Sequence, residues 1–324
     1  MKEQKERFEV VCWCIAYNQK NYIRQALDGF LIQKTNFPIV AVVHDDASTD
    51  GTADIIKEYA DKYPSLFIPL LEKENQWKKH DGSLVRISNE VVKKYGAKYL
   101  AFCEGDDYWI DPYKLQKQYD FLETHPDFSC CHTGFACVDS LSTPIFREDY
   151  ERKNSLGTNG ERFWYTMLVE NYILTCTIMV RSSIYITRPT WYHDYGLFLH
   201  AARHGYVGFI SDITSCYRQT PGSIMNDPNK FANLMIAHKR VTLNEIENIL
   251  NKEKGTIEKV YDFPNKNRAI GRMLIFCFQK SDKILRNRVF RLWCHHPFLF
   301  IIGLFQKIRG KAPKDFFLTS ESIS

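Results

Sequence analysis

The chain of 324 residues lacks several features that define common protein classes. It has no internal repeat, no low-complexity tract and, among its ten cysteines, no Cys-x-x-Cys pair. Residues 1–7 are mostly charged and include no apolar segment of the kind that forms a secretory signal. We therefore expect neither a cysteine zinc site nor a disulfide framework, but reduced cysteines in a cytoplasmic protein.

The composition is that of an ordinary folded protein, with 44% hydrophobic, 25% charged and 14% aromatic residues. This balance excludes a disordered, collagen-like or coiled-coil chain. The formal net charge of +5 is too small to indicate nucleic-acid binding. The length suggests either one large α/β domain with an appendage or two domains.

Three short apolar runs, at residues 10–15, 39–43 and 99–103, are typical of strands buried on both faces of a parallel sheet. Amphipathic helical patterns separate these runs. The alternation predicts an α/β fold with a doubly wound, mostly parallel sheet, followed by C-terminal helices. The other predicted elements are helices over 22–31, 53–60, 83–95, 111–122, 231–250 and 268–285 and strands over 171–181 and 206–217.

Acidic residues directly follow two of the predicted strands. Asp45 and Asp46 follow the second run, and Glu104, Asp106 and Asp107 follow the third. The carboxyl ends of parallel strands meet at one edge of a sheet, where ligands bind. Clustered carboxylates raise one another's pKa unless a cation neutralises them, and Mg²⁺ or Mn²⁺ suits such a cluster when phosphate oxygens complete its shell. The cluster after the third run predicts either a metal and nucleotide-diphosphate site or a polar turn before the next helix.

Three segments occur in a specific order and spacing: Val11-Cys-Trp-Cys-Ile-Ala-Tyr17-Asn18, His44-Asp-Asp-Ala-Ser-Thr-Asp-Gly51 and Cys103-Glu-Gly-Asp-Asp-Tyr-Trp109. Over residues 8–220 the chain thereby resembles family-2 glycosyltransferases of the bacterial polysaccharide type, whose nucleotide-sugar-binding domain has the GT-A fold. The resemblance implies transfer of a sugar from a nucleotide-diphosphate donor, UDP-linked by expectation, with Mg²⁺ or Mn²⁺ and with inversion at the anomeric carbon.

The resemblance also implies residues that bind the donor. Tyr17 and Asn18 would border the nucleotide. Asp45 or Asp46 would accept a hydrogen bond from the base. Arg86 would neutralise charge on the leaving diphosphate, the alternative being that it belongs to a solvated helix face.

The acidic signature of the family usually reads Asp-x-Asp. By the resemblance, Asp106 would hold the metal ion. Glu104 stands at the first position of the signature and would bind the ribose or the metal. Asp107 would also belong to the cofactor-binding residues.

An inverting transfer needs a carboxylate that accepts the proton of the acceptor hydroxyl. By the resemblance, Asp194 is the candidate base, with His193 as a rival or a tuning partner. The alternative is that Asp194 only caps the helix that follows. Two residues after Arg218, where many relatives carry a histidine, this chain has Thr220, which removes a possible additional metal ligand.

The resemblance and the charge pattern together predict a nucleotide-sugar-binding and catalytic domain over 1–225, a helical extension over 226–287 and a tail over 288–324. Between residues 286 and 314 there are seven basic residues and no acidic one. The apolar stretch 292–305 is shorter than the ~20 residues that span a bilayer. It suits either a peripheral anchor on the anionic inner face of a membrane or a helix that docks on the catalytic domain. A membrane surface would suit a glycan or lipid-linked acceptor.

Two other classes of function can be compared with this prediction. A sugar nucleotidyltransferase is expected to carry a glycine-rich phosphate loop after its first strand, and residues 16–20 contain no glycine. A catalytically inactive nucleotide-sugar-binding module is expected to have lost the downstream base, whereas Asp194 is present. The sequence therefore favours a glycosyltransferase.

Overall fold

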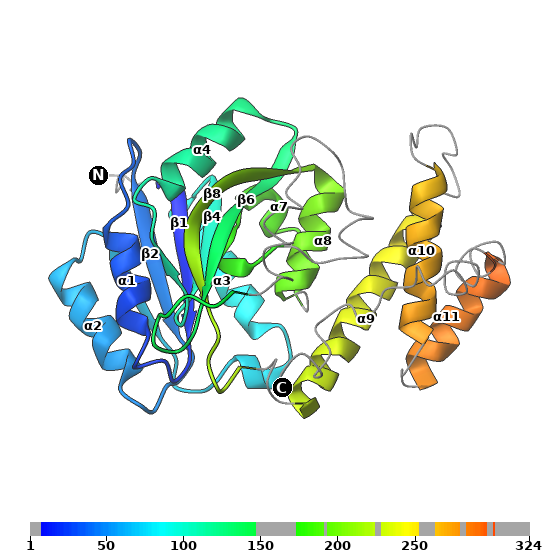
Figure 1. The fold of residues 1–324 in the computed structure, drawn as a ribbon, viewed down its shortest axis with the longest axis horizontal. Coiled ribbons are helices and arrows are strands. Elements are labelled where there is room, and N and C mark those ends of the chain that lie inside the picture. Colours follow the sequence, from blue (N-terminus) through cyan, green and yellow to red (C-terminus); the bar gives the residue numbers. More distant parts are fainter. Residues whose placement is uncertain are drawn as a thin grey trace. The chain divides into compact units, whose positions relative to one another are not determined.

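The computed structural model describes residues 8–146, 173–190, 193–223, 228–252, 263–278, 283–296 and 301 (Figure 1). The chain forms two compact units. The first consists of Met1–Arg162 and Tyr172–Thr220, and the second of Phe163–Asn171 and Pro221–Ser324. Most of the predicted apolar stretch 292–305 and of the basic tail lies outside the described residues.

In the described part of the first unit, the strands form one eight-stranded sheet in the order β3-β2-β1-β4-β7-β6-β8-β5. Strands β3, β2, β1 and β4 pair in parallel, as do β6 and β8, whereas β7 and β5 are antiparallel to their neighbours. The predicted mostly parallel α/β sheet is confirmed. The strands are β1 (Val10–Ala16), β2 (Ile39–Asp45), β3 (Phe67–Leu71), β4 (Tyr99–Glu104), β5 (Tyr108–Trp109), β6 (Phe128–Val138), β7 (Met179–Arg181) and β8 (Tyr206–Arg218).

Helices cover both faces of this sheet (Figure 1). Successive side chains of β1 point to opposite faces, so each face has apolar side chains for the helices to cover. Cys12 and Cys14 pack into a core with the buried stripes of α1, α2 and α4. On the parallel strand β4, Phe102 instead contacts Tyr185, with ring centroids 5.4 Å apart. The helices of this unit are α1 (Ile23–Leu31), α2 (Thr52–Lys62), α3 (Ser83–Tyr95), α4 (Lys114–Thr124), α7 (Ser182–Tyr185) and α8 (Asp194–His204), with 3-10 turns η1 (Trp77–Lys79) and η2 (Thr175–Thr177).

The strand register brings the predicted site residues to one edge of the sheet. Ala16 on β1 pairs with Asp45 on β2, and Ile15 pairs with Glu104 on β4. The three loops that follow these strands therefore start from neighbouring positions.

Three sequence-based boundaries are wrong. Of the strand predicted over 171–181, residues 171 and 172 lie outside the described residues, and within 173–181 only Met179–Arg181 is a strand. It is preceded by η2, because Trp109 and Ser215 donate side-chain hydrogen bonds of 2.9 Å to the carbonyl of Cys176. The helix predicted from Asp111 begins at Lys114, after a turn in which Asp111 accepts the N–H of Tyr113. The helix predicted over 268–285 is two helices, each with its own buried stripe, and apolar spacing alone did not separate them.

The second unit is helical in its described residues, with α9 (Pro228–Lys252), α10 (Phe263–Phe278) and α11 (Lys283–His295). These helices pack through buried side chains such as Ile246, Leu274 and Val289. Arg288 also pairs with Glu247, with N···O distances of 3.1 and 2.6 Å. In the parts of the chain that the structure describes, no helix combines the length and the apolar character that a membrane crossing requires.

Candidate active site

The loop after β1 is held against the loop after β2. The N–H of Asn18 donates to Ser48 Oγ at 2.8 Å, and Asn18 Oδ1 accepts the N–H of Thr49 at 2.8 Å. Asn18 has a positive φ of 53°, a conformation that asparagine tolerates better than most residues. These bonds fix the backbone next to Tyr17, whose side chain remains 39% exposed.

Asp45 and Asp46 are both buried, but their carboxylates have different partners. Asp46 accepts the N–H groups of Gln76 at 2.6 Å and Trp77 at 3.1 Å, one on each oxygen. Asp45 Oδ2 accepts the N–H of Ser48 at 3.0 Å, whereas Asp45 Oδ1 is enclosed without a hydrogen-bond partner. Asp46 therefore anchors the loop that contains η1, and Asp45 keeps one free acceptor atom.

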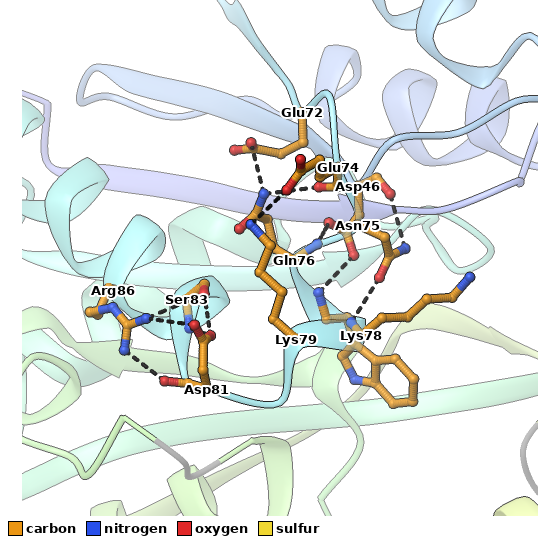
Figure 2. A network of polar contacts seen from close by, with 11 residues as sticks. Asp46, Glu72, Glu74, Asn75, Gln76, Lys78, Lys79, Asp81, Ser83 and Arg86 are labelled. Carbon is orange, nitrogen blue, oxygen red and sulfur yellow. Dashed lines mark hydrogen bonds and ion pairs between the residues drawn. The ribbon is translucent and has the colours of Figure 1, made fainter.

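Figure 2 shows how the segment from Glu72 to Arg86 is organised around this anchor. Asn75 donates to the carbonyl of Asp46 at 3.0 Å and accepts the N–H of Lys78 at 2.8 Å. The Nζ atom of Lys78 lies 3.4 Å from the hydroxyl of Tyr17 and 5.3 Å from the centre of its ring. The anchored loop thus brings a cation to the predicted nucleotide-binding residue.

Arg86 lies in the first turn of α3, where its side chain is about half exposed. Its guanidinium donates to the carbonyl of Asp81 at 2.7 Å and to Ser83 Oγ at 3.2 Å (Figure 2). It also lies 3.4 Å from the carboxylate of Asp81. In this structure Arg86 is bound to its own loop, so it must exchange these partners to reach a diphosphate.

The carboxylates after β4 are crowded and poorly solvated. Burial raises the pKa of Glu104 to about 8, and the charges of Asp106 and Asp194 add to this effect. Burial likewise raises the pKa of Asp106 and places that of Asp107 well above its ordinary value. Glu104 Oε2 is enclosed without a hydrogen-bond partner. The charge of Arg218 counteracts the rise for Asp106 only in part. Clustered carboxylates of this kind are the ones that a bound cation would stabilise.

Arg218, on the last position of β8, orients two members of this cluster. Its backbone N–H donates to Asp107 Oδ1 at 2.8 Å, and its Nε donates to the carbonyl of Asp106 at 2.8 Å. Its guanidinium lies over the rings of Tyr22 and Tyr108. Arg218 thus turns the carboxylate of Asp107 inward and fixes the backbone of Asp106.

The buried Lys114 was missed from the sequence, although its place beside Leu115 in an apolar stripe could have signalled it. Its Nζ donates to Gln118 Oε1 at 2.6 Å and to the carbonyl of Thr177 at 3.1 Å. Burial lowers the pKa of Lys114 to about 8. These bonds hold η2, whose Cys176 thiol donates to Asp107 and thereby lowers the pKa of that carboxyl group slightly. Lys114 therefore contributes to the acidic cluster indirectly, by holding η2 in contact with Asp107.

Asp194 is the first residue of α8, with His193 at the capping position before it. Its side chain is exposed, and its Oδ1 accepts the N–H of Tyr195 at 2.6 Å. Because its charge raises the pKa of Glu104, Asp194 lies within electrostatic reach of the acidic cluster. The structure therefore brings the candidate base and the candidate metal residues to the same region.

In the residues the structure describes, no group of three or more His, Cys, Asp or Glu side chains is arranged to hold a metal ion. Mg²⁺ needs only one or two protein carboxylates when phosphate oxygens and water supply the other ligands. Glu104 Oε2 is enclosed without a hydrogen-bond partner, and burial raises the pKa of the Asp106 carboxyl group although Arg218 counteracts it. Both residues offer hard oxygen donors. These residues fit an ion bound jointly with a diphosphate.

Helices on both faces of a mostly parallel sheet, with carboxylates gathered where β1, β2 and β4 end, define an α/β enzyme of the GT-A type. The chain belongs to glycosyltransferase family 2, because the family model "Glycosyl transferase family 2" matches residues 14–185. The family predicted from the sequence is confirmed.

Relatives of known or proposed activity agree with this assignment. The chain is 25% identical over 225 residues to a putative teichuronic acid biosynthesis glycosyltransferase of Bacillus subtilis, covering 67% of this chain and 81% of the relative. It is 26% identical over 225 residues to an Escherichia coli enzyme named UDP-Glc:alpha-D-GlcNAc-diphosphoundecaprenol beta-1,3-glucosyltransferase, covering 68% and 80%. An uncharacterised protein of Mycobacterium tuberculosis is 48% identical over 117 residues, which are 36% of this chain and 32% of that protein. The match thus spans about a third of the mycobacterial relative.

Solved structures share the fold. The S. aureus protein TarS, residues 1–349, in complex with UDP-GlcNAc gives a TM-score of 0.53 at 17% identity over 95% of this chain and 89% of that chain. A mannosyltransferase of Pyrobaculum calidifontis in complex with GDP-Man and Mn²⁺ gives 0.50 at 13% identity over 94% and 88%. The GT-A fold predicted from the sequence is confirmed.

Proposed function

We propose that the protein transfers a sugar, with inversion, from a nucleotide-diphosphate donor to a hydroxyl group of a glycan or lipid-linked acceptor. The observation that carries the proposal is the crowded cluster of Glu104, Asp106 and Asp107, with Asp194 close enough to raise the pKa of Glu104. Among the relatives, the Escherichia coli enzyme is named for a UDP-Glc donor and a diphosphoundecaprenol-linked acceptor, which supports a UDP-linked donor here.

The donor would lie over the loops after β1 and β2. Tyr17 and Asn18 would border the nucleotide. Asp45 is the better candidate to accept a hydrogen bond from the base, because its Oδ1 is free whereas both oxygens of Asp46 are occupied. Arg86 would turn from Asp81 to the diphosphate, as an exposed side chain can do at small energetic cost.

The acidic cluster would hold Mg²⁺ or Mn²⁺ chiefly through Asp106, with Glu104 as a second oxygen donor, and Asp107 would contribute by fixing the loop. When bound, the ion would stabilise negative charge on the departing diphosphate.

Asp194 would accept the proton of the acceptor hydroxyl. The acceptor oxygen then forms a bond to the anomeric carbon, while the bond from that carbon to the diphosphate oxygen breaks. The nucleoside diphosphate leaves with the electron pair, and the sugar is inverted because entry and departure occur on opposite faces.

The proposal is tested by donor binding and turnover with a panel of nucleotide sugars, with and without Mn²⁺. Asp106→Asn should abolish metal-dependent donor binding. Asp194→Asn should bind donor but lose turnover by about 10²-fold or more, the usual contribution of a general base. Asp54→Asn, an exposed carboxylate on α2, is the matched control and should change neither. If no nucleotide sugar binds with any metal, the proposed function is wrong.

We further propose that the second unit contacts the anionic inner face of a membrane. The described α11 exposes the apolar side chains of Ile284 (70%) and Phe290 (61%), interspersed with the exposed Arg286 and Arg291. Such a mixture is typical of interfacial helices. The protein should bind vesicles that contain phosphatidylglycerol and should not bind pure phosphatidylcholine vesicles. This binding should weaken when the salt concentration is raised, and it should also be weaker in Phe290→Ser. Equal binding to both kinds of vesicle would contradict the electrostatic contribution.

A further inference from the structure

Arg188 is a buried arginine without a counter-charge among the described residues. It lies between α7 and α8 and is only 6% exposed. Its guanidinium stacks on the ring of Tyr185, 3.4 Å from the ring centre. Within the parts of the chain that the structure describes, no aspartate or glutamate pairs with Arg188. A buried cation without a counter-charge is rare in proteins, since desolvation of the charge is strongly unfavourable.

Both hydrogen bonds that Arg188 donates to described residues come from one nitrogen of its guanidinium, Nη1. Nη1 donates to the carbonyl of Tyr185 at 2.7 Å and to Asn89 Oδ1 at 3.3 Å. Nε is enclosed and has no acceptor. Nη2 has no hydrogen bond to the described residues either, although it is not fully enclosed. The edge formed by Nε and Nη2 therefore makes no hydrogen bond to the described residues.

This edge is the part of an arginine side chain that binds carboxylates and phosphates through two parallel hydrogen bonds. The same chain shows the arrangement elsewhere, because Arg288 uses Nε and Nη2 to bind the two carboxylate oxygens of Glu247. At Arg188 the corresponding donors have no acceptor among the described residues.

The surroundings of Arg188 connect it with the acceptor side of the site. The backbone of Thr190, two residues later, packs against Gly82 at the start of α3, since a Cβ atom on Gly82 would lie 2.9 Å from the carbonyl oxygen of Thr190. Burial lowers the pKa of His193, the charge of Asp194 raises it, and the positive charges of His80 and Arg188 lower it further. Arg188 therefore lies within electrostatic reach of His193, which directly precedes the candidate base Asp194.

We propose that the Nε and Nη2 edge of Arg188 binds an oxyanion, a phosphate or carboxylate group, carried by the acceptor. Only the assignment of the oxyanion to the acceptor rests on the proposed function. The oxyanion site itself is defined by Arg188 and its partners. Binding an anion here would neutralise a charge that is otherwise buried alone. It would also place the acceptor beside Asp194.

The oxyanion site is tested with inorganic phosphate as the probe and the full chain. We expect phosphate, compared with chloride at equal ionic strength, to raise the thermal unfolding midpoint, and Arg188→Met to lose about tenfold or more in apparent phosphate affinity. Arg24→Met is the matched control, because Arg24 is exposed and already paired with Glu58. Without phosphate, Arg188→Met should unfold at the same temperature or higher, since it removes an unpaired buried charge. Arg188→Lys keeps the charge but not the fork and should bind phosphate weakly.

Phosphate and donor binding by the Arg86 and Arg188 variants distinguish the possible sources of the anion. If Arg86→Met abolishes the phosphate response and Arg188→Met does not, the probe binds at the donor site and the proposal is overturned. If Arg188→Met weakens donor binding about tenfold, the oxyanion belongs to the donor and the acceptor assignment is wrong. A phosphate response that depends on Arg188, in a protein that binds no nucleotide sugar, would keep the anion site and refute only the proposed transferase reaction.

Discussion

Gly105, between Glu104 and Asp106, should tolerate no side chain. A Cβ atom there would lie 3.0 Å from Ala16 Cβ and 3.0 Å from Ile23 Cδ1, and closer still to Gln19 Oε1. Contacts of this length force neighbours to move, and the buried Ala16 and Ile23 have little freedom to do so. We expect Gly105→Ala to destabilise the fold by about 1–3 kcal/mol, the usual effect of overpacking.

The same substitution should also impair the site, because Gln19 is the first group in the way. The Gln19 side chain donates a hydrogen bond to Asp106 that counteracts the rise in the pKa of that carboxyl group caused by burial. Displacing Gln19 would move the carboxylate proposed to hold the metal. A displacement of ~1 Å in a reacting geometry lowers rates by on the order of 10²-fold. We therefore expect a fall in kcat/KM of about tenfold to a hundredfold, seen mostly as weaker metal-dependent donor binding.

Urea unfolding and donor titration with Mn²⁺ measure the two effects separately. Gly222→Ala is the control, because no atom lies within 4 Å of the position its Cβ would take. If Gly105→Ala unfolds at the wild-type urea concentration and binds donor normally, the close packing around the acidic turn does not exist and the reasoning is refuted. If stability falls but donor binding does not, the link through Gln19 to Asp106 is wrong.

Three further predictions concern buried charges. Burial raises the pKa of Glu104 to about 8, above its unfolded value. The metal-free protein should therefore lose stability as the pH rises from about 4.5 to 8. In Glu104→Gln, the urea midpoint plotted against pH should be flatter over this range. Burial lowers the pKa of Lys114 to about 8, below its unfolded value, so stability should rise between about pH 8 and 10.5, and Lys114→Met should remove that slope in the same assay. Asp46→Asn removes the acceptor of one of the two N–H groups that hold the η1 loop. Trypsin should therefore cleave after Lys78 faster in this variant than in the wild type. An unchanged cleavage rate would mean that the hydrogen bonds to Asp46 are not needed to hold the loop.

The sheet and the position of its acidic edge followed from the sequence because they depend on local patterns. The apolar runs at 10–15, 39–43 and 99–103 are strands in the structure, and the residues after them lie at one edge, as parallel pairing requires. The strand predicted over 171–181 was wrong because distant side chains, Trp109 and Ser215, bind the backbone there. Local spacing carries no information about such partners.

The individual site residues were less predictable, for a related reason. The sequence offered Asp45 and Asp46 as equal candidates, and only their hydrogen bonds to Ser48 and to the η1 loop distinguish them. Lys114 gave only the weak signal of its place in an apolar stripe, and Arg188 gave none. Their importance lies in burial without a carboxylate partner among the described residues, which is a property of the tertiary structure.

Three buried titratable groups among the described residues have a common physical consequence. Glu104, Asp107 and Arg188 are held in enclosed surroundings by Arg218, η2 and Tyr185, and each is unfavourable in the free protein. A ligand that binds only the folded state stabilises it in proportion to its affinity and concentration. Donor with metal would relieve the acidic cluster, and an anionic acceptor would relieve Arg188. The two increments in unfolding temperature should therefore be separable: Asp106→Asn should abolish the first and Arg188→Met the second. A single variant that abolished both would show that the cluster and Arg188 form one site and that the separation argued here is wrong.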